Sequence, residues 1–446
     1  MGQRARILTQ IAGFTGWKVT DAYWESATGR RFEQVGCYDV PIDAKLVLVM
    51  GRRWAPRCGQ CLTIVPGPPH QRREPRRWVD LPWGEHRVVI EYAPERLKCR
   101  RCGCHATELL GWAEPKQRQT RRFQQHLALD AFSMPLVHVS TKYGLSWHTV
   151  RRAEHDAIER WEFTRPVVPL LLVGVDEKWL GRRHKSLHKY VTIVSNLETG
   201  EPVWIGYGRS AETLKTWFAT LTPEQKSAIR LFAMDMHRPF LNAVREDPVL
   251  ARVPVVHDPF HIMKRAGEAL TELRREVFFR AGPELRAIGR GTRWLVLRAW
   301  EKATEEQRGQ LLAILALNPK LAHAYQVVEE LREALRAPDA ITMMVGLGRV
   351  LRRTQRRDNV PMRKLHDSII EHYPQIVALG EHHPPTGRIE ALNNNWETLV
   401  RRGRGYRNHH YLLKKLRFLV ANPVRDGNGV QRFLALGLTS PLRVAA

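Results

Sequence analysis

Residues 170–178 read LLLVGVDEK, a continuous apolar run that stops at two carboxylates, Asp176 and Glu177. Uninterrupted apolar residues are typical of a strand that is buried on both faces of its sheet, whereas a half-exposed strand alternates. Residues 230–238 read RLFAMDMHR and repeat the pattern, with Asp235 after the apolar segment. Both runs therefore predict buried strands that carry an acidic side chain at their carboxyl ends.

The segments around these two runs alternate between strand and helix patterns. Their order is strand, strand, strand, helix, strand, helix, strand, helix, which predicts a mixed sheet with helices on its faces. The expected strands are Leu170–Val175, Tyr190–Ser195, Pro202–Tyr207, Ala228–Met234 and Val253–Val256, and the expected helices are Ala211–Leu221 and Pro239–Val244. From Ile262 to Pro385 the pattern is helical, and Thr386 to Val420 supplies a last helical section.

Two carboxylates at neighbouring strand ends repel one another unless cations lie between them. Two Mg²⁺ ions held by such acids activate a water molecule and stabilise the leaving oxygen in phosphoryl transfer, and magnesium needs only a few protein carboxylates. Asp176 and Asp235 are therefore candidate metal ligands, although a single strand-end Asp is more often a cap or turn residue. The residues alone leave three candidates for a third acid: Glu177, Asp258 and Glu390.

The charge balance points to a polyanionic partner. The 446 residues include 71 Lys and Arg against 45 Asp and Glu, which gives a net charge of +26 and a pI of about 10.4. Neutralising phosphates releases counterions, so a nucleic acid suits this excess, and arginine favours fork-like contacts with phosphate and guanine. The sequence has no run of eighteen apolar residues and no secretory signal, so we expect a cytoplasmic protein without a membrane span.

Five of the six cysteines lie in one stretch, and four of them form two Cys-x-x-Cys pairs, Cys58 with Cys61 and Cys99 with Cys102. Clustered cysteines in a cytosolic chain indicate a metal before a disulfide. Two such pairs can place four thiolates tetrahedrally around Zn²⁺, with unrelated free thiols as the alternative. We expect a hairpin containing Arg87–Tyr92 to bridge the gap between the pairs, and Cys104 to be a spare thiol.

Residues 120–161 carry a three-helix pattern that is typical of a helix-turn-helix. Gln124–Ser133 and Leu136–Tyr143 are the first two expected helices, and Gly144-Leu145 forms a tight turn. Ser146 is a suitable N-cap for a third, basic helix. The side chains in its first turns, where bases and phosphates would be met, are Trp147, His148, Thr149, Arg151 and Arg152.

Glu390 opens the helix-like run IEALNNNWETLVRRGRGYRN, which covers residues 389–408. Its neighbours are polar or basic, and these residue types suit an end of the helix that faces DNA. The residues concerned are Asn393, Asn394, Arg401, Arg402 and Arg404.

Over nearly its full length the chain resembles the ISL-three group of bacterial insertion-sequence transposases. The matching pieces occur in order: the two CxxC pairs, GLSWHTV at 144–150, GVDEK at 174–178, LFAMDM at 231–236, VVHDPFHIMK at 255–264, and the run at 389–408. The resemblance implies an RNase H-like catalytic core with the triad Asp176, Asp235 and Glu390, interrupted by an all-α insertion domain. Asp258 and His261 resemble a D-x-x-H signature of related transposases, which implies that they support the active site.

One departure from the family pattern concerns the first cysteine pair. The family usually reads C-P-x-C-G, whereas this chain has Ala55 at the position of the first cysteine, and Cys61 restores a CxxC that is shifted by three.

The expected fold is multidomain α+β, with five segments along the chain. They are a β-rich zinc-binding domain at 1–112, a helix-turn-helix at 113–165, the first part of the core at 166–264, a helical insertion at 265–385, and the last catalytic helix and tail at 386–446.

These features predict a DDE transposase that binds the terminal inverted repeats of an insertion sequence. It would use Mg²⁺ or Mn²⁺ for phosphodiester hydrolysis and strand transfer on double-stranded DNA, with Zn²⁺ in the N-terminal domain. Two element ends must be joined, so we expect a homodimer or larger assembly on DNA, associated with the nucleoid. The alternative is a catalytically silent, domesticated DNA-binding regulator. A nonspecific RNase H-type nuclease, the third possibility, would not need the N-terminal 160 or so residues.

Overall fold

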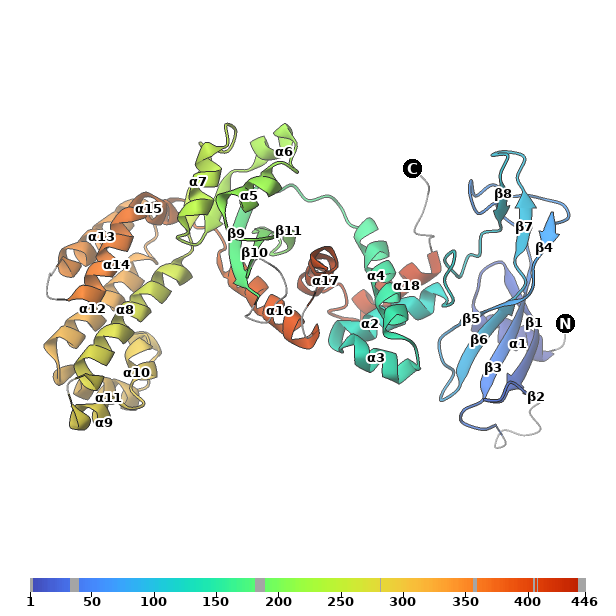
Figure 1. Ribbon diagram of the computed structural model, residues 1–446, viewed down its shortest axis with the longest axis horizontal. Coiled ribbons are helices and arrows are strands. Elements are labelled where there is room, and N and C mark those ends of the chain that lie inside the picture. The colour runs from blue at the N-terminus through green and yellow to red at the C-terminus, as the bar shows by residue number, and fades with distance from the viewer. Residues whose placement is uncertain are drawn as a thin grey trace. The chain divides into compact units, whose positions relative to one another are not determined.

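The computed structural model describes residues 3–32, 40–180, 189–280, 282–355, 359–403, 406 and 408–439 (Figure 1). They group into two units. The first unit holds the residues up to Val167, together with Leu399–Tyr406 and the residues from Asn422 onward, and the second holds Val168–Thr398 and the residues from Arg407 to Ala421. The segment 386–446, which the sequence suggested as one piece, is thus distributed over both units, while the five-domain division itself stays a prediction.

The N-terminal part of the first unit is a five-stranded sheet in the order β2-β1-β3-β6-β5. Its elements are α1 (Gln3–Ala12), β1 (Trp17–Glu25), β2 (Arg31–Phe32), β3 (Lys45–Arg52), β5 (Arg76–Val79) and β6 (Arg87–Tyr92). The pair β3 and β6 is parallel, and the other neighbours are antiparallel. The core under this sheet is aromatic, with Trp17 and Trp78 each packed edge-on against Trp112.

A second, three-stranded sheet lies in the same unit, in the order β4 (Gln71–Arg72), β7 (Glu95–Lys98), β8 (His105–Thr107). The turn between β7 and β8 carries Cys99 and Cys102. The sequence suggested a hairpin containing Arg87–Tyr92 in the gap between the two cysteine pairs, and this is confirmed, because β6 pairs antiparallel with the preceding strand β5. Residues 87–92 form β6, which hydrogen-bonds to β3 and β5 in the larger sheet.

Three helices follow as the sequence predicts: α2 (Arg121–Ser133), α3 (Leu136–Tyr143) and α4 (Trp147–Phe163). Gly144 ends α3 in the left-handed conformation, φ 59°, which glycine adopts at low cost, and this reverses the chain before α4. Phe123, Leu127 and Val150 form the small apolar core between the helices. This confirms the helix-turn-helix.

A fourth helix, α18 (Gly427–Thr439), packs against α2, although the sequence suggested no role for the C-terminal tail. The Gln125 side-chain amide donates a hydrogen bond of 2.7 Å to the Phe433 carbonyl, and both groups are buried. A side chain at Gly437 would meet the Arg122 Cα at 2.9 Å, so the missing Cβ permits this close approach. The end of the chain therefore completes the helical part of the first unit.

The second unit is built on a five-stranded sheet in the order β11-β10-β9-β12-β13. The strands are β9 (Leu172–Trp179), β10 (Tyr190–Asn196), β11 (Pro202–Tyr207), β12 (Leu231–Met234) and β13 (Val255–His257). The strands β9, β12 and β13 are parallel, while β10 and β11 are antiparallel to their neighbours. The predicted mixed sheet and the order of its elements are confirmed.

The expected bounds of three strands in this sheet were wrong by two residues or more: those of β9 and β12, and the start of β13, which is Val255 and not Val253. The strand β9 runs past Asp176 to Trp179, because hydrogen bonding to β10 continues through the polar residues. Asp176 therefore lies inside a strand, whereas Asp235 does follow the end of β12. The strand β12 begins at Leu231 and not at Ala228, because Thr222 and Gln225 form a capping box that starts the short helix α6 (Pro223–Ala228).

Helices cover both faces of this sheet. Val173 and Val175 of β9 point to the face that packs against α5 (Ala211–Phe218) and α7 (Arg238–Glu246), with Trp217 and Phe240 in the core. The opposite face carries Leu197, Ala233 and Val256 and is covered by Ile389 of α16 (Gly387–Gly403). Since side chains alternate along a strand, Gly174 and Asp176 lie on the α16 face.

The chain between the sheet and α16 is helical, as predicted (Figure 1). The apolar faces of these helices form one core that also includes Met236, the residue after Asp235. The helices between the sheet and α16 are α8 (Pro259–Phe279), α9 (Pro283–Gly289), α10 (Arg293–Leu297), η1 (Trp300–Lys302), α11 (Glu305–Ala316), α12 (Pro319–Ala334), α13 (Ala340–Thr354), α14 (Val360–Glu371) and α15 (Tyr373–His382). After α16, the helix α17 (His409–Ala421) packs on β11.

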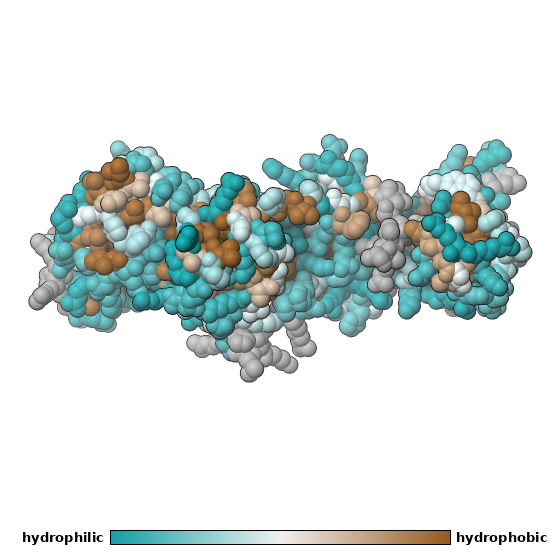
Figure 2. All heavy atoms as spheres, turned by 90° about the horizontal axis from the view of Figure 1, so that it is seen from above, coloured by the Kyte–Doolittle hydropathy of each residue, from teal (hydrophilic) through white to brown (hydrophobic). Residues whose placement is uncertain are grey.

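In the part of the chain that the structure describes, every helix is too short or too polar to cross a membrane. The face drawn in Figure 2 is predominantly hydrophilic, with separate apolar patches between polar regions.

Candidate active site and DNA-binding elements

Asp176 lies where α16 crosses the sheet, and Gly174 makes this crossing possible. A Cβ at Gly174 would meet the Ser195 Oγ at 2.6 Å, the Leu197 Cδ2 at 2.7 Å and the Ile389 Cγ1 at 3.2 Å. The absence of a side chain therefore lets α16 approach β9 closely. One step further along the same strand face, this brings the helix over the Asp176 carboxylate.

The Asp176 carboxylate is only 5% exposed and is well supplied with donors. The Asn393 Nδ2 donates to its Oδ2 at 2.7 Å, and the Glu177 backbone N–H donates to its Oδ1 at 2.8 Å. The Lys178 ammonium lies 3.2 Å from Oδ2. These contacts hold the carboxylate in one orientation.

Asp235 faces Asp176 across His261. The His261 Nδ1 lies 3.2 Å from the Asp235 Oδ2, and its Nε2 lies 4.0 Å from the Asp176 Oδ1. Burial lowers the pKa of His261, but the hydrogen bond and charge of Asp235 and the charge of Asp176 outweigh burial, so the pKa is raised. Burial raises the pKa of Asp235, but His261 and the Met236 N–H outweigh it, so this pKa is lowered. The protonated form of His261 and the ionised form of Asp235 thus stabilise each other.

Asp258 holds the helix that carries His261. It is the N-cap of α8, and its side chain accepts a hydrogen bond of 3.0 Å from the Phe260 N–H. Burial raises the pKa of this carboxyl group, and the charges of Asp176 and Asp235 act in the same direction. Of the two residues expected to support the site, Asp258 fixes the start of α8 and His261 reaches both acids.

Glu390, the expected third acid, lies in the first turn of α16 and is exposed. Among the described residues it makes no hydrogen bond or ion pair. Asn393 is three residues further along the same helix, so the two side chains are neighbours on its surface. Because Asn393 contacts Asp176, Glu390 lies one helical turn from the paired acids, but the structure does not bring it into contact with them.

Sequence reasoning missed three groups at this site. Lys178 and Asn393 contact Asp176, and the sequence suggested a DNA-facing place for Asn393. Arg265 of α8 donates to the Met236 carbonyl at 3.2 Å and to the Ser368 hydroxyl at 2.8 Å. It thereby ties the turn after Asp235 to α14. Asn393 and Lys178 stand next to recognised motifs in the sequence, but nothing in the sequence marks Arg265.

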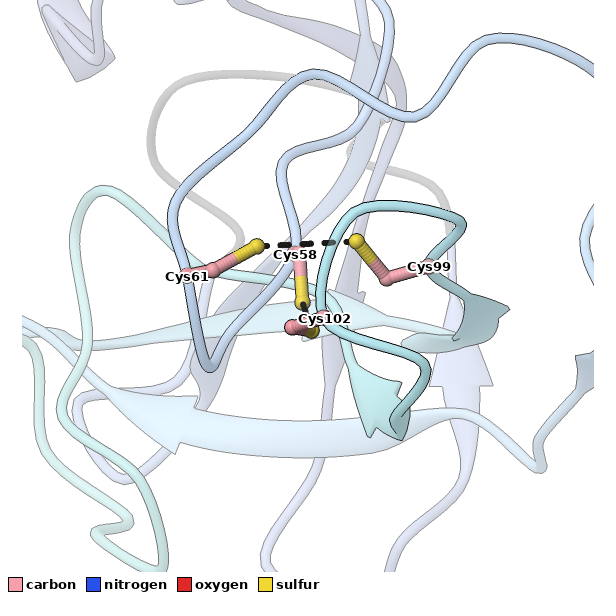
Figure 3. Close-up of side chains that lie close together, drawn as sticks. All are labelled: Cys58, Cys61, Cys99 and Cys102. Atoms are coloured by element: carbon pink, nitrogen blue, oxygen red, sulfur yellow. Dashed lines mark hydrogen bonds between the residues drawn. The ribbon is translucent and has the colours of Figure 1, made fainter.

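The four cysteines of the two pairs form one cluster, as the sequence predicts (Figure 3). The Sγ–Sγ distance is 3.8 Å between Cys58 and Cys102 and 3.5 Å between Cys61 and Cys99. A tetrahedral zinc site with Zn–S bonds of about 2.3 Å has S–S distances of roughly 3.8 Å. Cys104 is exposed and lies outside the cluster. The chemistry and spacing of the four sulfurs therefore fit Zn²⁺, and the shift caused by Ala55 leaves the cluster complete.

The two cysteine loops have the same backbone form. The residue after the second cysteine has positive φ in each loop, 64° at Leu62 and 69° at Gly103. A Cβ at Gly59 would lie 2.3 Å from the Thr107 carbonyl oxygen, so glycine lets the first loop approach β8. Hydrogen bonds with Thr63 lower the pKa of the Cys61 thiol to about 6. A thiolate at Cys61 is thus available to a metal near neutral pH.

The first turns of α4 present the side chains that the sequence suggested for DNA contact. The Ser146 side chain accepts a hydrogen bond from the Thr149 N–H at 3.2 Å, which caps the helix. Trp147 is 40% exposed and has the Arg151 guanidinium 5.6 Å from its ring centre. His148 and Arg152 are exposed as well. These residues are accessible to a partner, and their contact with DNA stays a prediction.

The basic residues expected on α16 have different surroundings. Asn394 and Arg401 are exposed. The Arg402 guanidinium donates a hydrogen bond to the Phe132 carbonyl at the end of α2, so it is engaged within the protein. Arg404 lies outside the described residues.

The chain thus combines a helix-turn-helix with a mixed sheet in which Asp176 of β9 and Asp235, after the end of the adjacent parallel strand β12, both approach His261. A family model described as "Transposase" matches residues 173–416, more than half of the chain, and the model "Helix-turn-helix domain of transposase family ISL3" matches residues 108–158. The chain therefore belongs to the transposase family ISL3. It is an insertion-sequence DNA transposase with a helix-turn-helix DNA-binding domain, and thus a DNA-transposition enzyme.

Relatives support this assignment. The chain is 26% identical to the transposase for insertion sequence element IS1001 of Bordetella parapertussis, over 92% of this chain and 97% of the relative. It is also 26% identical to the transposase for insertion sequence element IS1557 of two Mycobacterium tuberculosis strains, over 76% of this chain and 80% of each relative. The family and these names favour the transposase over the regulator that the sequence left as an alternative.

Proposed function

We propose that the second unit is an RNase H-like catalytic core in which Asp176, Asp235 and Glu390 hold two Mg²⁺ or Mn²⁺ ions. The observation that carries this proposal is the convergence of Asp176 and Asp235, on adjacent parallel strands, at one imidazole. Hard carboxylate oxygens in such a pair are the donors that Mg²⁺ prefers. The bound ions would activate water or a 3′-hydroxyl and stabilise the leaving oxygen in the hydrolysis and strand-transfer steps.

The chain's own residues would orient the acids. Asn393 and Lys178 both contact the Oδ2 atom of Asp176, and the Glu177 N–H donates to Oδ1, so these contacts orient the carboxylate. His261 lies between the two acids, with its Nδ1 3.2 Å from the Asp235 Oδ2 and its Nε2 4.0 Å from the Asp176 Oδ1. Glu390 would complete the set from the first turn of α16, adjacent to Asn393. Such catalysis depends on positioning and charge stabilisation, with little covalent chemistry for the side chains.

The first unit would bind the DNA. We assign the terminal inverted repeats to α4, through Trp147, His148, Thr149, Arg151 and Arg152, and further contacts to Asn394, Arg401 and Arg404. Cys58, Cys61, Cys99 and Cys102 would hold a structural Zn²⁺ that joins the loop before β4 to the β7–β8 turn. Joining two ends requires two copies, so we propose a homodimer or larger assembly on DNA, which chromosomal DNA would bring to the nucleoid.

The five-segment division is part of the same proposal, with the helices α8–α15 as the insertion between β13 and α16. One observation refines it: α18 belongs with the helix-turn-helix, because it packs on α2.

The test is strand cleavage and strand transfer on a DNA that carries the ends of the element. Asp176→Asn and Glu390→Gln keep the size of the side chains and remove their charge. We expect both variants to lose cleavage by at least about a hundredfold, while end binding in Ca²⁺ or without metal is retained. Full cleavage by Glu390→Gln would refute the role of that residue, and the Glu397→Gln variant on the same helix is the matched control.

A further inference from the structure

A cleft of about 750 Å³ lies beside α4 in the first unit, between this helix and the loop 116–119. One wall is the first half of α4, with His148, Arg151 and Arg152, and the other is the loop, with Lys116 and Arg118. This loop precedes α2 and lies within residues 108–158, which the helix-turn-helix family model matches, but outside the three helices of the motif itself. The cleft therefore extends the surface of the DNA-reading helix by a second element.

The cations of this loop have no acidic partner among the described residues. Lys116 and Arg118 are exposed, and the Arg118 guanidinium lies 5.8 Å from the centre of the Trp78 ring. Arg152, on the opposite wall, is likewise exposed and has no ion pair there. Such uncompensated positive charge in a cleft raises the local concentration of an anionic partner.

The loop is held in place from both sides. The Gln117 side-chain amide donates to the Asp156 carboxylate of α4 at 2.9 Å, and the Val79 N–H of β5 donates to the Arg118 carbonyl at 2.8 Å. Lys116 has a φ of 61°, a left-handed conformation that is unfavourable for a non-glycine residue. A strained residue persists where its surroundings fix it, so the two cations are pre-positioned.

The charge changes sign along the cleft. Its far end is lined by the second half of α4, with His155, Asp156 and Glu159. His148 and Asp156 are eight residues apart, which corresponds to roughly 12 Å along a helix axis. A polyanion would therefore be attracted to the first two turns of α4 and repelled from the later ones.

We propose that this cleft binds the phosphate backbone of one DNA strand, with Lys116 and Arg118 as phosphate contacts opposite Arg151 and Arg152. The inference rests on the proposed role of α4 in binding the element's ends. In this arrangement α4 reads bases with its first turns, and the loop fixes how deeply and in which register the helix enters the groove.

The test measures how binding of an end-containing duplex by the full chain depends on salt. Each phosphate contact contributes about 0.9 to the slope of log K against log salt, so Lys116→Gln/Arg118→Gln should reduce the slope by about 1.8. When the salt is raised from 50 to 200 mM, the affinity of the double variant should therefore fall by about 12-fold less than that of the wild type. Specific and nonspecific duplexes should be affected alike, since phosphates carry no sequence information.

A matched variant, Arg30→Gln/Arg53→Gln, removes two exposed cations of the same unit outside the cleft. An equal change of slope in both double variants would overturn the proposal, because net charge alone would then set the slope. Phosphate ethylation interference gives a second measurement: the loop variant should lose interference at one group of phosphates on one strand and keep the rest. If the wild type shows no preference for the element's ends, the proposed function fails. If the wild type prefers the ends but the loop variant keeps the slope of the wild type, the proposed function stands and only this inference fails.

Discussion

Gly174→Ala is the substitution for which the structure allows the most specific prediction. The new methyl group would lie 2.6 Å from the Ser195 Oγ, 2.7 Å from the Leu197 Cδ2 and 3.2 Å from the Ile389 Cγ1. Ordinary contacts between such atoms are about 3.5–4.0 Å, so the sheet side must yield by roughly 1 Å and α16 by several tenths of an ångström. Overpacking of this kind costs about 1–3 kcal/mol of unfolding free energy.

The effect on activity should exceed the effect on stability. Asn393 and Glu390 are carried by α16, so a shift of this helix moves them relative to the Asp176 carboxylate. A displacement of about 1 Å in a catalytic group can reduce the rate by about a hundredfold. We therefore expect Gly174→Ala to remain folded, to melt at a lower temperature, and to cleave its DNA at least about tenfold more slowly under single-turnover conditions.

Two variants make this reasoning refutable. Gly309→Ala adds the same methyl group in a helix where it meets nothing within 4 Å, and it should leave activity unchanged and stability equal or higher by up to about 1 kcal/mol. Ile389→Ala removes the atoms that the new methyl meets on α16, so the double variant should recover part of the loss caused by Gly174→Ala. If Gly174→Ala matched the wild type in melting and cleavage, the close approach of α16 would not be what places Asn393 at Asp176.

Three further predictions follow from other contacts. Cys99→Ser should release the bound zinc, measured by metal analysis of the purified protein, whereas Cys104→Ser should retain it, and equal zinc contents would refute the four-thiol site. Arg265→Gln should lower the cleavage rate and weaken Mn²⁺ binding, measured by calorimetry, because the Met236 carbonyl loses its hydrogen-bond donor. The control Arg275→Gln, on the same helix, should change neither the cleavage rate nor Mn²⁺ binding. Burial, with the nearby His372, lowers the pKa of His257 to about 4, so the unfolded chain binds the proton more readily between pH 6.5 and 4. Stability is then full above pH 6.5 and falls by up to about 3 kcal/mol as pH drops to 4, and thermal melting of His257→Gln should show a weaker dependence across this window.

The sequence alone determined the order of the elements and most of the candidate residues. Apolar runs, caps and turn residues depend on neighbours within a few positions, which is why the strands from β9 to β13 and the helices α2–α4 were predictable. The CxxC spacing likewise predicted which four cysteines form the cluster, because each pair lies within one short loop. The sequence placed Asp235 correctly at a strand end, but it ended β9 too early.

Only the tertiary structure decided which distant groups meet. Three contacts at the site join residues that are far apart in the sequence, so no periodic pattern predicts them. They are the contact of Asn393 with Asp176, the position of His261 between Asp176 and Asp235, and the hydrogen bond from Arg265 to Met236. The packing of α18 on α2 was likewise not predictable, because an apolar helix face does not indicate which element it packs against. Local patterns thus specify each helix and strand, because these elements depend on interactions between residues that are close in the sequence. The site instead depends on the close approach of α16 to β9, which the absence of a side chain at Gly174 permits.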